Sequence, residues 1–186
     1  MFTASVVIRE FESDDESGWV RCRVLGFLDT SYFDDVQATK PQYGDAVELV
    51  AVVDDLVVGI CAATHAGEAA TLETIAIHPD FRRRRIGHDL LAEAIERLSA
   101  AGCSTLEAWT REDRGTLAWY EAEGFKRQFR YLHVYASSPE EMQTAVTPTL
   151  PLMPRVRHFH AWEHEEEQMR GTFDRVHGCN QYVRRV

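Results

Sequence analysis

One segment of the chain restricts the fold more than any other, because an alternating apolar run passes through a basic turn into an amphipathic helix. The run spans Ala69–Ile77, and a helix is predicted from about Gly87 to Ala101, where apolar residues recur at helical spacing. A second β-rich run, Thr105–Thr110, follows. Two parallel strands joined by a helix form a right-handed crossover, so this segment predicts a parallel βαβ unit.

The turn between the first run and the helix is suited to bind an anion. It holds four arginines followed by an isoleucine, a glycine and a histidine: Arg82, Arg83, Arg84, Arg85, Ile86, Gly87 and His88. The first N–H groups of a helix lack a partner inside the helix, and the helix dipole places about half a positive charge there. The turn therefore favours a phosphate or pyrophosphate, in a chain whose net charge is otherwise −10.

The remaining patterns complete an α+β fold class. Hairpin signals and β-rich runs predict strands at Val6–Arg9, Val47–Val53, Leu56–Thr64 and Phe125–Tyr135. Helical spacing predicts helices at about 14–27, 32–38 and 115–123, the last one closed by Gly124.

A proline-rich stretch divides the chain into three parts. We expect a domain over residues 1–136, a connector over 137–154 and a helical arm over 155–186, with its helix from about Ala161 to Val176. The arm is expected to pack on the core or on a second subunit, which allows a homodimer. It also holds His158, His160 and His164, but they do not form the His-Glu-x-x-His pattern, and we predict no metal site.

Composition excludes several classes of partner. An excess of 30 acidic over 20 basic residues argues against nucleic-acid binding. No run reaches the roughly 18 consecutive apolar residues of a membrane span, and the N-terminus has no signal-peptide pattern. The four cysteines lack a Cys-x-x-Cys spacing and are predicted to be buried, reduced thiols of a cytoplasmic protein.

Two stretches carry a family resemblance. Thr74–Gly87 forms the strand, turn and helix start, with Arg82 and Gly87 at the ends of a pattern written (Q/R)-x-x-G-x-(G/A); Ala118–Phe125 contains Tyr-x-x-x-Gly-Phe. In these elements and at this spacing, the chain resembles the GNAT acetyltransferase superfamily over about Val6–Tyr135. The resemblance implies a mixed, centrally splayed sheet flanked by helices.

The chain departs from the family pattern in the turn and after it. Arg85 stands where the first signature glycine is usual, and it is strained if the backbone there needs a positive φ. Asp113 stands where asparagine is frequent, and Thr116 where alanine is usual.

The resemblance implies acetyl-CoA as co-substrate. Its pyrophosphate is expected on the amides from Arg83 to His88, with Gly87 allowing close approach of the backbone. Its pantetheine arm is expected between the splayed strands, where one strand N–H also faces the thioester oxygen. The residues implied for this co-substrate are Ile75, Ala76, Ile77, Arg82, Arg83, Arg84, Arg85, Ile86, Gly87, His88, Asp113 and Thr116.

Two catalytic groups are predicted. Tyr120 stands where the family commonly carries a tyrosine that protonates the leaving thiolate; the alternative is a core tyrosine. Glu73 is the expected base for the amine, because strand alternation places it on the face of Ile75 and Ile77; the alternative is a solvated strand glutamate. Weaker candidates for the base are Glu107 and Asp113.

The family's acceptor pocket lies between the first two helices. That region offers Phe27, Tyr32, Phe33 and Asp34, and an aromatic and acidic lining suits a cation; these side chains are otherwise core aromatics and a solvated helix face. The resemblance thus implies an N-acetyltransferase whose amine attacks acetyl-CoA directly in a ternary complex. The acceptor is a small-molecule amine, a protein N-terminus or a lysine. A non-catalytic acyl-CoA-binding or regulatory module and an assembly protein are the alternatives.

Overall fold

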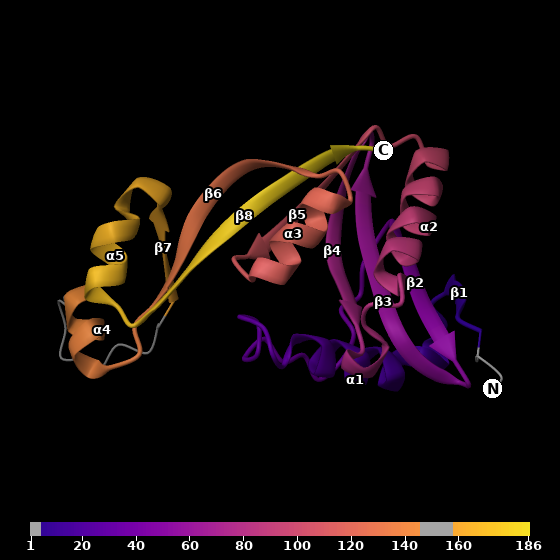
Figure 1. Ribbon diagram of the computed structural model, residues 1–186. Coiled ribbons are helices and arrows are strands. Elements are labelled where there is room, and N and C mark those ends of the chain that lie inside the picture. Colours follow the sequence, from indigo (N-terminus) through magenta and orange to yellow (C-terminus); the bar gives the residue numbers. More distant parts are fainter. Residues whose placement is uncertain (1–4, 146–157) are drawn as a thin grey trace.

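The computed structural model describes residues 5–145 and 158–186. Within them, the strands form one mixed sheet in the order β1-β2-β3-β4-β5-β8-β6-β7 (Figure 1). The strands are β1 Val7–Glu10, β2 Ala46–Val53, β3 Leu56–Ala66, β4 Ala69–Ile77, β5 Thr105–Arg111, β6 Lys126–Tyr135, β7 His158–Trp162 and β8 Arg175–Arg185. The α-helices are α1 Glu16–Phe27, α2 Ile86–Ala100, α3 Arg114–Ala122, α4 Pro139–Ala145 and α5 Glu166–Thr172.

The α+β class and the central crossover are confirmed. β4 and β5 are parallel and α2 connects them. The apolar stripe of α2, with Leu90 and Leu98 fully buried, packs in the main core. Trp19 of α1 packs in a second core with Ile60 of β3. Because neighbouring Cys61 of β3 belongs to the main core, the two helices cover opposite faces of the sheet.

The sheet splays open at its centre, as predicted. β4 and β5 pair only from Ala69 to Leu72, opposite Thr105 to Ala108. Beyond that point β4 continues beside β3 to Ile77, and β5 continues beside β8 to Arg111. The backbone of β4 after Leu72 therefore has no pairing with β5, and a space opens between the two strands.

The predicted helix over 32–38 is wrong. Residues 28–34 form turns. Thr30 starts these turns locally, because its Oγ1 donates to the carbonyl of Phe27 and accepts from the N–H of Tyr32. Such bonds between side chain and backbone compete with the bonds of a helix. Arg23 holds the end of the segment through Asp35 at 2.8 Å.

The predicted helical arm is wrong for most of its length. Among the described residues 158–186, only α5 is α-helical, and β8 lies in the middle of the sheet between β5 and β6. β8 has the period-2 pattern of a strand, since Val176, Asn180 and Tyr182 are all buried. In Figure 1, β6 and β8 run side by side away from the core toward β7, α4 and α5.

The predicted connector also contains a helix. α4 begins with Pro139, which is tolerated in a first helical turn. Met142 of α4 packs with Leu132 of β6 and Phe173 in a third core. Residues 146–154 of the connector lie outside the residues that the structure describes.

Two residues of the basic turn have a backbone conformation that is unfavourable for arginine. Arg83 and Arg85 both have φ of 65°, in the left-handed region. A side chain with a Cβ costs roughly 1–2 kcal/mol there. The strain predicted for Arg85 under a positive φ is therefore present, at the residue immediately before α2.

Replacing Arg85 with glycine should relieve this strain. We expect Arg85→Gly to raise the free energy of unfolding by about 1 kcal/mol, because glycine adopts a positive φ freely. Arg84→Gly is the matched control, since Arg84 has no positive φ and should lose about 0.5–1 kcal/mol. Urea unfolding of both variants measures the difference. Equal losses in the two variants would show that Arg85 is unstrained.

Candidate functional site

A cavity of about 1020 Å³ occupies the splay between β4 and β5. It is bounded by the basic turn, by α3 and by the end of α1. Most of the residues predicted for a site line it: Phe27, Tyr32, Glu73, Ile75, Ala76, Ile77, Arg82, Arg83, Arg85, Gly87, His88, Asp113, Thr116 and Tyr120. Five do not: Phe33, Asp34, Arg84, Ile86 and Glu107. Ile86 is instead buried in the main core.

The basic turn presents a run of free amides. The N–H of Arg82 donates to Pro79, and the N–H of Asp89 donates to Arg85. Between them, the six N–H groups from Arg83 to His88 have no hydrogen-bond partner in the described part of the chain. They stand at the positive end of α2, so the turn is an anion site by backbone as well as by charge.

Gly87 keeps the space in front of these amides open. A Cβ placed on Gly87 would meet no protein atom closer than 3.7 Å, the nearest belonging to Ile77 and Trp119. These are ordinary contact distances. The protein itself therefore does not need glycine here, whereas a ligand lying against the turn would.

The four arginines of the turn make different contacts. Arg82 makes a two-point ion pair with Asp29, at 2.7 and 2.9 Å, and lowers the pKa of that carboxyl. Arg84 lies over the ring of Phe81 and outside the cavity. Arg83 and Arg85 line the cavity and form no ion pair with a described residue. Of these four arginines, Arg83 and Arg85 are therefore the two whose charge is available to an anion in the cavity.

Tyr120 lies on α3 with its ring nearly enclosed. The side chain is 5% exposed, and its ring stacks on that of Tyr182 at 5.3 Å. Phe125 meets the same ring edge to face. Burial raises the pKa of Tyr120 above its usual value, so the hydroxyl keeps its proton at neutral pH. A tyrosine in this state can donate a proton to a group in the cavity.

Glu73 sits on a β-bulge. Ala62 of β3 pairs with Thr74 while Ala63 pairs with Leu72, so Glu73 has no partner in the ladder. The bulge breaks the alternation of β4: Leu72 and Ile75 both pack in the main core. The predicted reason for choosing Glu73, a shared face with Ile75 and Ile77, is therefore wrong. Glu73 nevertheless lines the cavity.

Glu73 is the carboxylate of the cavity lining that contacts neither a basic side chain nor a backbone N–H among the described residues. It is exposed and accepts one hydrogen bond, from Thr64 Oγ1 at 2.7 Å. The other carboxylates of the lining are occupied: Asp29 by Arg82, Asp35 by Arg23, Glu123 by His88, and Asp113 by the N–H and hydroxyl of Ser31. Glu73 is thus the acid of the lining that is free to accept a proton from a bound ligand.

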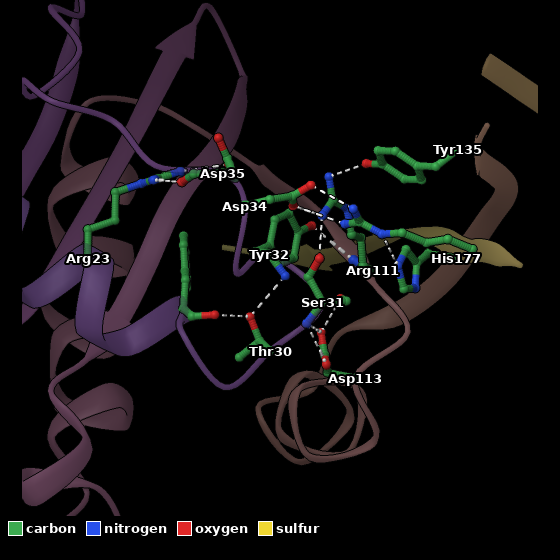
Figure 2. A network of polar contacts seen from close by, with 12 residues as sticks. Arg23, Thr30, Ser31, Tyr32, Asp34, Asp35, Arg111, Asp113, Tyr135 and His177 are labelled. Carbon is green, nitrogen blue, oxygen red and sulfur yellow. Dashed lines mark hydrogen bonds and ion pairs between the residues drawn. The ribbon is translucent and has the colours of Figure 1, made fainter. Parts of the chain in front are cut away.

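A polar network, shown in Figure 2, fixes the loop after α1 at the mouth of the cavity. The backbone N–H of Arg111 donates to the hydroxyl of Tyr32 at 2.9 Å, and its guanidinium lies 4.4 Å from the Tyr32 ring centre. The guanidinium also donates to the carbonyl of Ser31 and the hydroxyl of Tyr135. The loop is therefore attached both to β5 and to the extension formed by β6 and β8.

The predicted acceptor pocket is only half right. Phe27 and Tyr32 line the cavity, but Asp34 is paired with Arg175 of β8 at 2.7 Å, and Phe33 lies under the same guanidinium. Sequence reasoning missed two cavity residues that matter here, Arg23 and Trp109. Trp109 could have been found, because it alternates with buried Ala108 and Thr110 on β5.

Histidines gather away from this cavity. His158 and His160, which lie in the predicted arm, meet His133 of β6. His164 is not part of this group. The four cysteines are all buried and unpaired, as predicted.

Comparisons with known proteins agree with this geometry. Residues 45–127 match a family described as an acetyltransferase (GNAT) domain. An acetyltransferase of Pectobacterium atrosepticum is 29% identical over 119 residues, which are 61% of this chain and 83% of that protein. The described helices include none long and apolar enough to cross a membrane.

Solved structures share the fold. The ribosomal-protein-S18-alanine N-acetyltransferase of Escherichia coli superposes with a TM-score of 0.65 at 16% identity, covering 98% of this chain and 94% of that one. The PaiA N-acetyltransferase of Thermoplasma acidophilum, solved in complex with coenzyme A, gives 0.58 at 16% identity, covering 67% and 91%.

Proposed function

We propose that the chain is an acetyltransferase of the GNAT family, whose model matches residues 45–127, and that it transfers the acetyl group of acetyl-CoA to a primary amine by direct attack in a ternary complex. The observation that carries this proposal is the run of free amides from Arg83 to His88 at one end of the cavity. It offers a pyrophosphate several donors at once. The four thiols, buried and reduced, fit a protein of the cytoplasm.

Two parts of the chain bind acetyl-CoA: the basic turn and strand β4. The amides of the turn hold the pyrophosphate, and the side chains of Arg83 and Arg85 add charge. The backbone of Ile75, Ala76 and Ile77, which pairs with β3 but not with β5, forms hydrogen bonds with the peptide-like pantetheine arm inside the splay. Acetyl-CoA supplies the activated acetyl group, and a strand N–H stabilises the negative charge that grows on the thioester oxygen.

Two side chains move the protons. An amine of pKa ~10 is protonated at neutral pH and must lose a proton before it attacks. Glu73 accepts that proton, directly or through water, while the new C–N bond forms and the C–S bond breaks. Tyr120 donates its proton to the departing thiolate. No acyl-enzyme forms, since the thiols are buried and burial raises the pKa of Cys22 and Cys61 to about 12.

A thiol-release assay with acetyl-CoA over a panel of amines tests the activity. The panel includes small amines, amino acids and peptides with free N-termini or lysines. We expect release of free thiol that requires both an amine and the enzyme, in proportion to acetylated product. Binding of acetyl-CoA without release for any amine would instead support the non-catalytic module.

Closing the space in front of the turn should weaken binding of acetyl-CoA. We expect Gly87→Ala to raise the Kd for acetyl-CoA at least about tenfold, because a methyl group there displaces the pyrophosphate from the amides, a loss of about 1.4 kcal/mol. The protein should be as stable or slightly more stable, since alanine favours a helix by about 1 kcal/mol over glycine. Calorimetric titration measures the Kd.

Gly171→Ala in α5 is the matched control. Its Cβ would meet nothing within 4 Å, and Gly171 does not line the cavity. The control should gain stability in the same way and leave the Kd unchanged. An unchanged Kd in Gly87→Ala would remove the turn from the binding site.

A further inference from the structure

Three histidines converge on one face of the antiparallel ladder between β6 and β7, in the extension rather than at the cavity. His133 and His160 are directly opposite each other, and His158 precedes His160 by two residues and so lies on the same face. One ring nitrogen from each lies within 4.8 Å of the others. The rings of His133 and His160 are parallel, with centres 5.0 Å apart.

An unsatisfied atom in this cluster points to a missing ligand. The Nε2 of His133 contacts the hydroxyl of Tyr131 at 2.9 Å, but its Nδ1 is buried without a partner among the described residues. A buried polar atom in this state is uncommon and costly. Stacking of aromatic rings alone would not leave a buried ring nitrogen bare.

The cluster is poor in carboxylates. Asp34 is the acid that faces it, and Asp34 is already paired with Arg175. Arg111 and Arg175 also face the cluster, but the first donates to Tyr135 and the second to Asp34. His177 lies across β6 from His160, and its Nε2 accepts a hydrogen bond from Arg175. Hard cations that prefer oxygen ligands, Mg²⁺ and Ca²⁺, are therefore disfavoured.

A neutral imidazole has one ring nitrogen with a free lone pair, and that nitrogen can bind a metal ion. Zinc–nitrogen bonds of ~2.0–2.1 Å require ligand atoms roughly 3.3 Å apart in a tetrahedron. Rotation about the last side-chain bond, which is broad for histidine, brings the atoms that close.

We propose that His133, His158 and His160 bind a transition-metal dication that prefers imidazole ligands, with Zn²⁺ as the main candidate and one position left to water. Three histidines with an open fourth position are a known zinc geometry. The ion joins β6 to β7 and satisfies the bare nitrogen of His133. It lies on the extension, so the proposal stands or falls separately from acetyl transfer.

Calorimetric titration of Zn²⁺ into the tag-free, chelator-treated protein tests the site. We expect one zinc per chain with a Kd in the micromolar range or tighter, and a Tm that rises by several degrees at saturation. His160→Ala and His158→Ala should each weaken binding at least tenfold. Both residues are exposed, so these variants should keep the fold.

His164→Ala is the matched control. His164 lies in the same segment, just after β7, and does not belong to the cluster, so it should bind zinc as the unaltered protein does. Absence of one-to-one binding in the unaltered protein would overturn the proposal. Equal affinity in His160→Ala and His164→Ala would overturn it as well, because the zinc would then bind elsewhere.

Discussion

Replacing Tyr120 with phenylalanine should lower kcat about 1000-fold and leave the KM for acetyl-CoA nearly unchanged. A general acid typically contributes 10²–10⁴-fold, and a thiolate without a proton donor is a poor leaving group at this step. The ring of phenylalanine keeps the stacking on Tyr182 and the edge contact with Phe125. The fold should therefore survive, and steady-state kinetics with an amine found in the panel measures the loss.

Tyr182→Phe separates chemistry from packing. Tyr182 is the stacked partner of Tyr120, is similarly buried and does not line the cavity. Its loss of a hydroxyl should change kcat by less than about threefold, since among the described residues this hydroxyl makes a single hydrogen bond, to Glu121 at 3.5 Å. Equal, small losses in both variants would remove Tyr120 as the acid.

Replacing Glu73 with glutamine should lower kcat/KM about 100-fold at neutral pH. Glutamine keeps the shape and the hydrogen bond from Thr64 but cannot accept a proton. The loss should shrink as the pH rises, because an amine of pKa ~10 then deprotonates without help. A rate that recovers toward that of the unaltered enzyme at high pH is a signature that a purely structural role would not produce.

Glu107→Gln is the control for this variant. Glu107 lies on β5, accepts from Thr71 and Gln181, and does not line the cavity. Its pH profile should match that of the unaltered enzyme. A Glu73→Gln enzyme with the same profile would assign the amine's proton to bulk water instead.

Sequence patterns predict the part of this fold that depends on residues close together in the chain. The crossover from Ala69 to Arg111 follows from periodicity and one turn, and every element of it is confirmed. The sequence also points to Arg85, because the GNAT pattern that the chain resembles usually has glycine there; the positive φ that makes Arg85 strained comes from the structure.

What the patterns miss depends on contacts far apart in sequence. Glu73 reaches the cavity through a bulge, which is set by how β3 pairs with β4. More than 60 residues separate β8 from its partner β5, so the sequence near β8 does not indicate this pairing. The residues just before β8 have helical spacing, and this spacing led to the prediction of a helix instead of a strand. His133 joins the histidines of β7 only because the two strands pair.

The sequence gives no reason to treat the four arginines of the turn differently, because their partners lie far away in the chain. Arg82 pairs with Asp29, 53 residues earlier, and no local signal distinguishes it from Arg83. Asp34, predicted for the acceptor pocket, forms an ion pair with Arg175, which lies near the other end of the chain. Ion pairs between distant segments decide which charges stay available to a ligand.

The most direct test of the central claim is a titration of the ¹⁵N-labelled protein with coenzyme A, followed through its amide resonances. The amides from Arg83 to His88 are free in this structure, and we predict that they shift downfield together and saturate with the same Kd, because phosphate oxygens become their acceptors. If other amide resonances shift and saturate while the chemical shifts of these six do not change, coenzyme A does not bind at the basic turn.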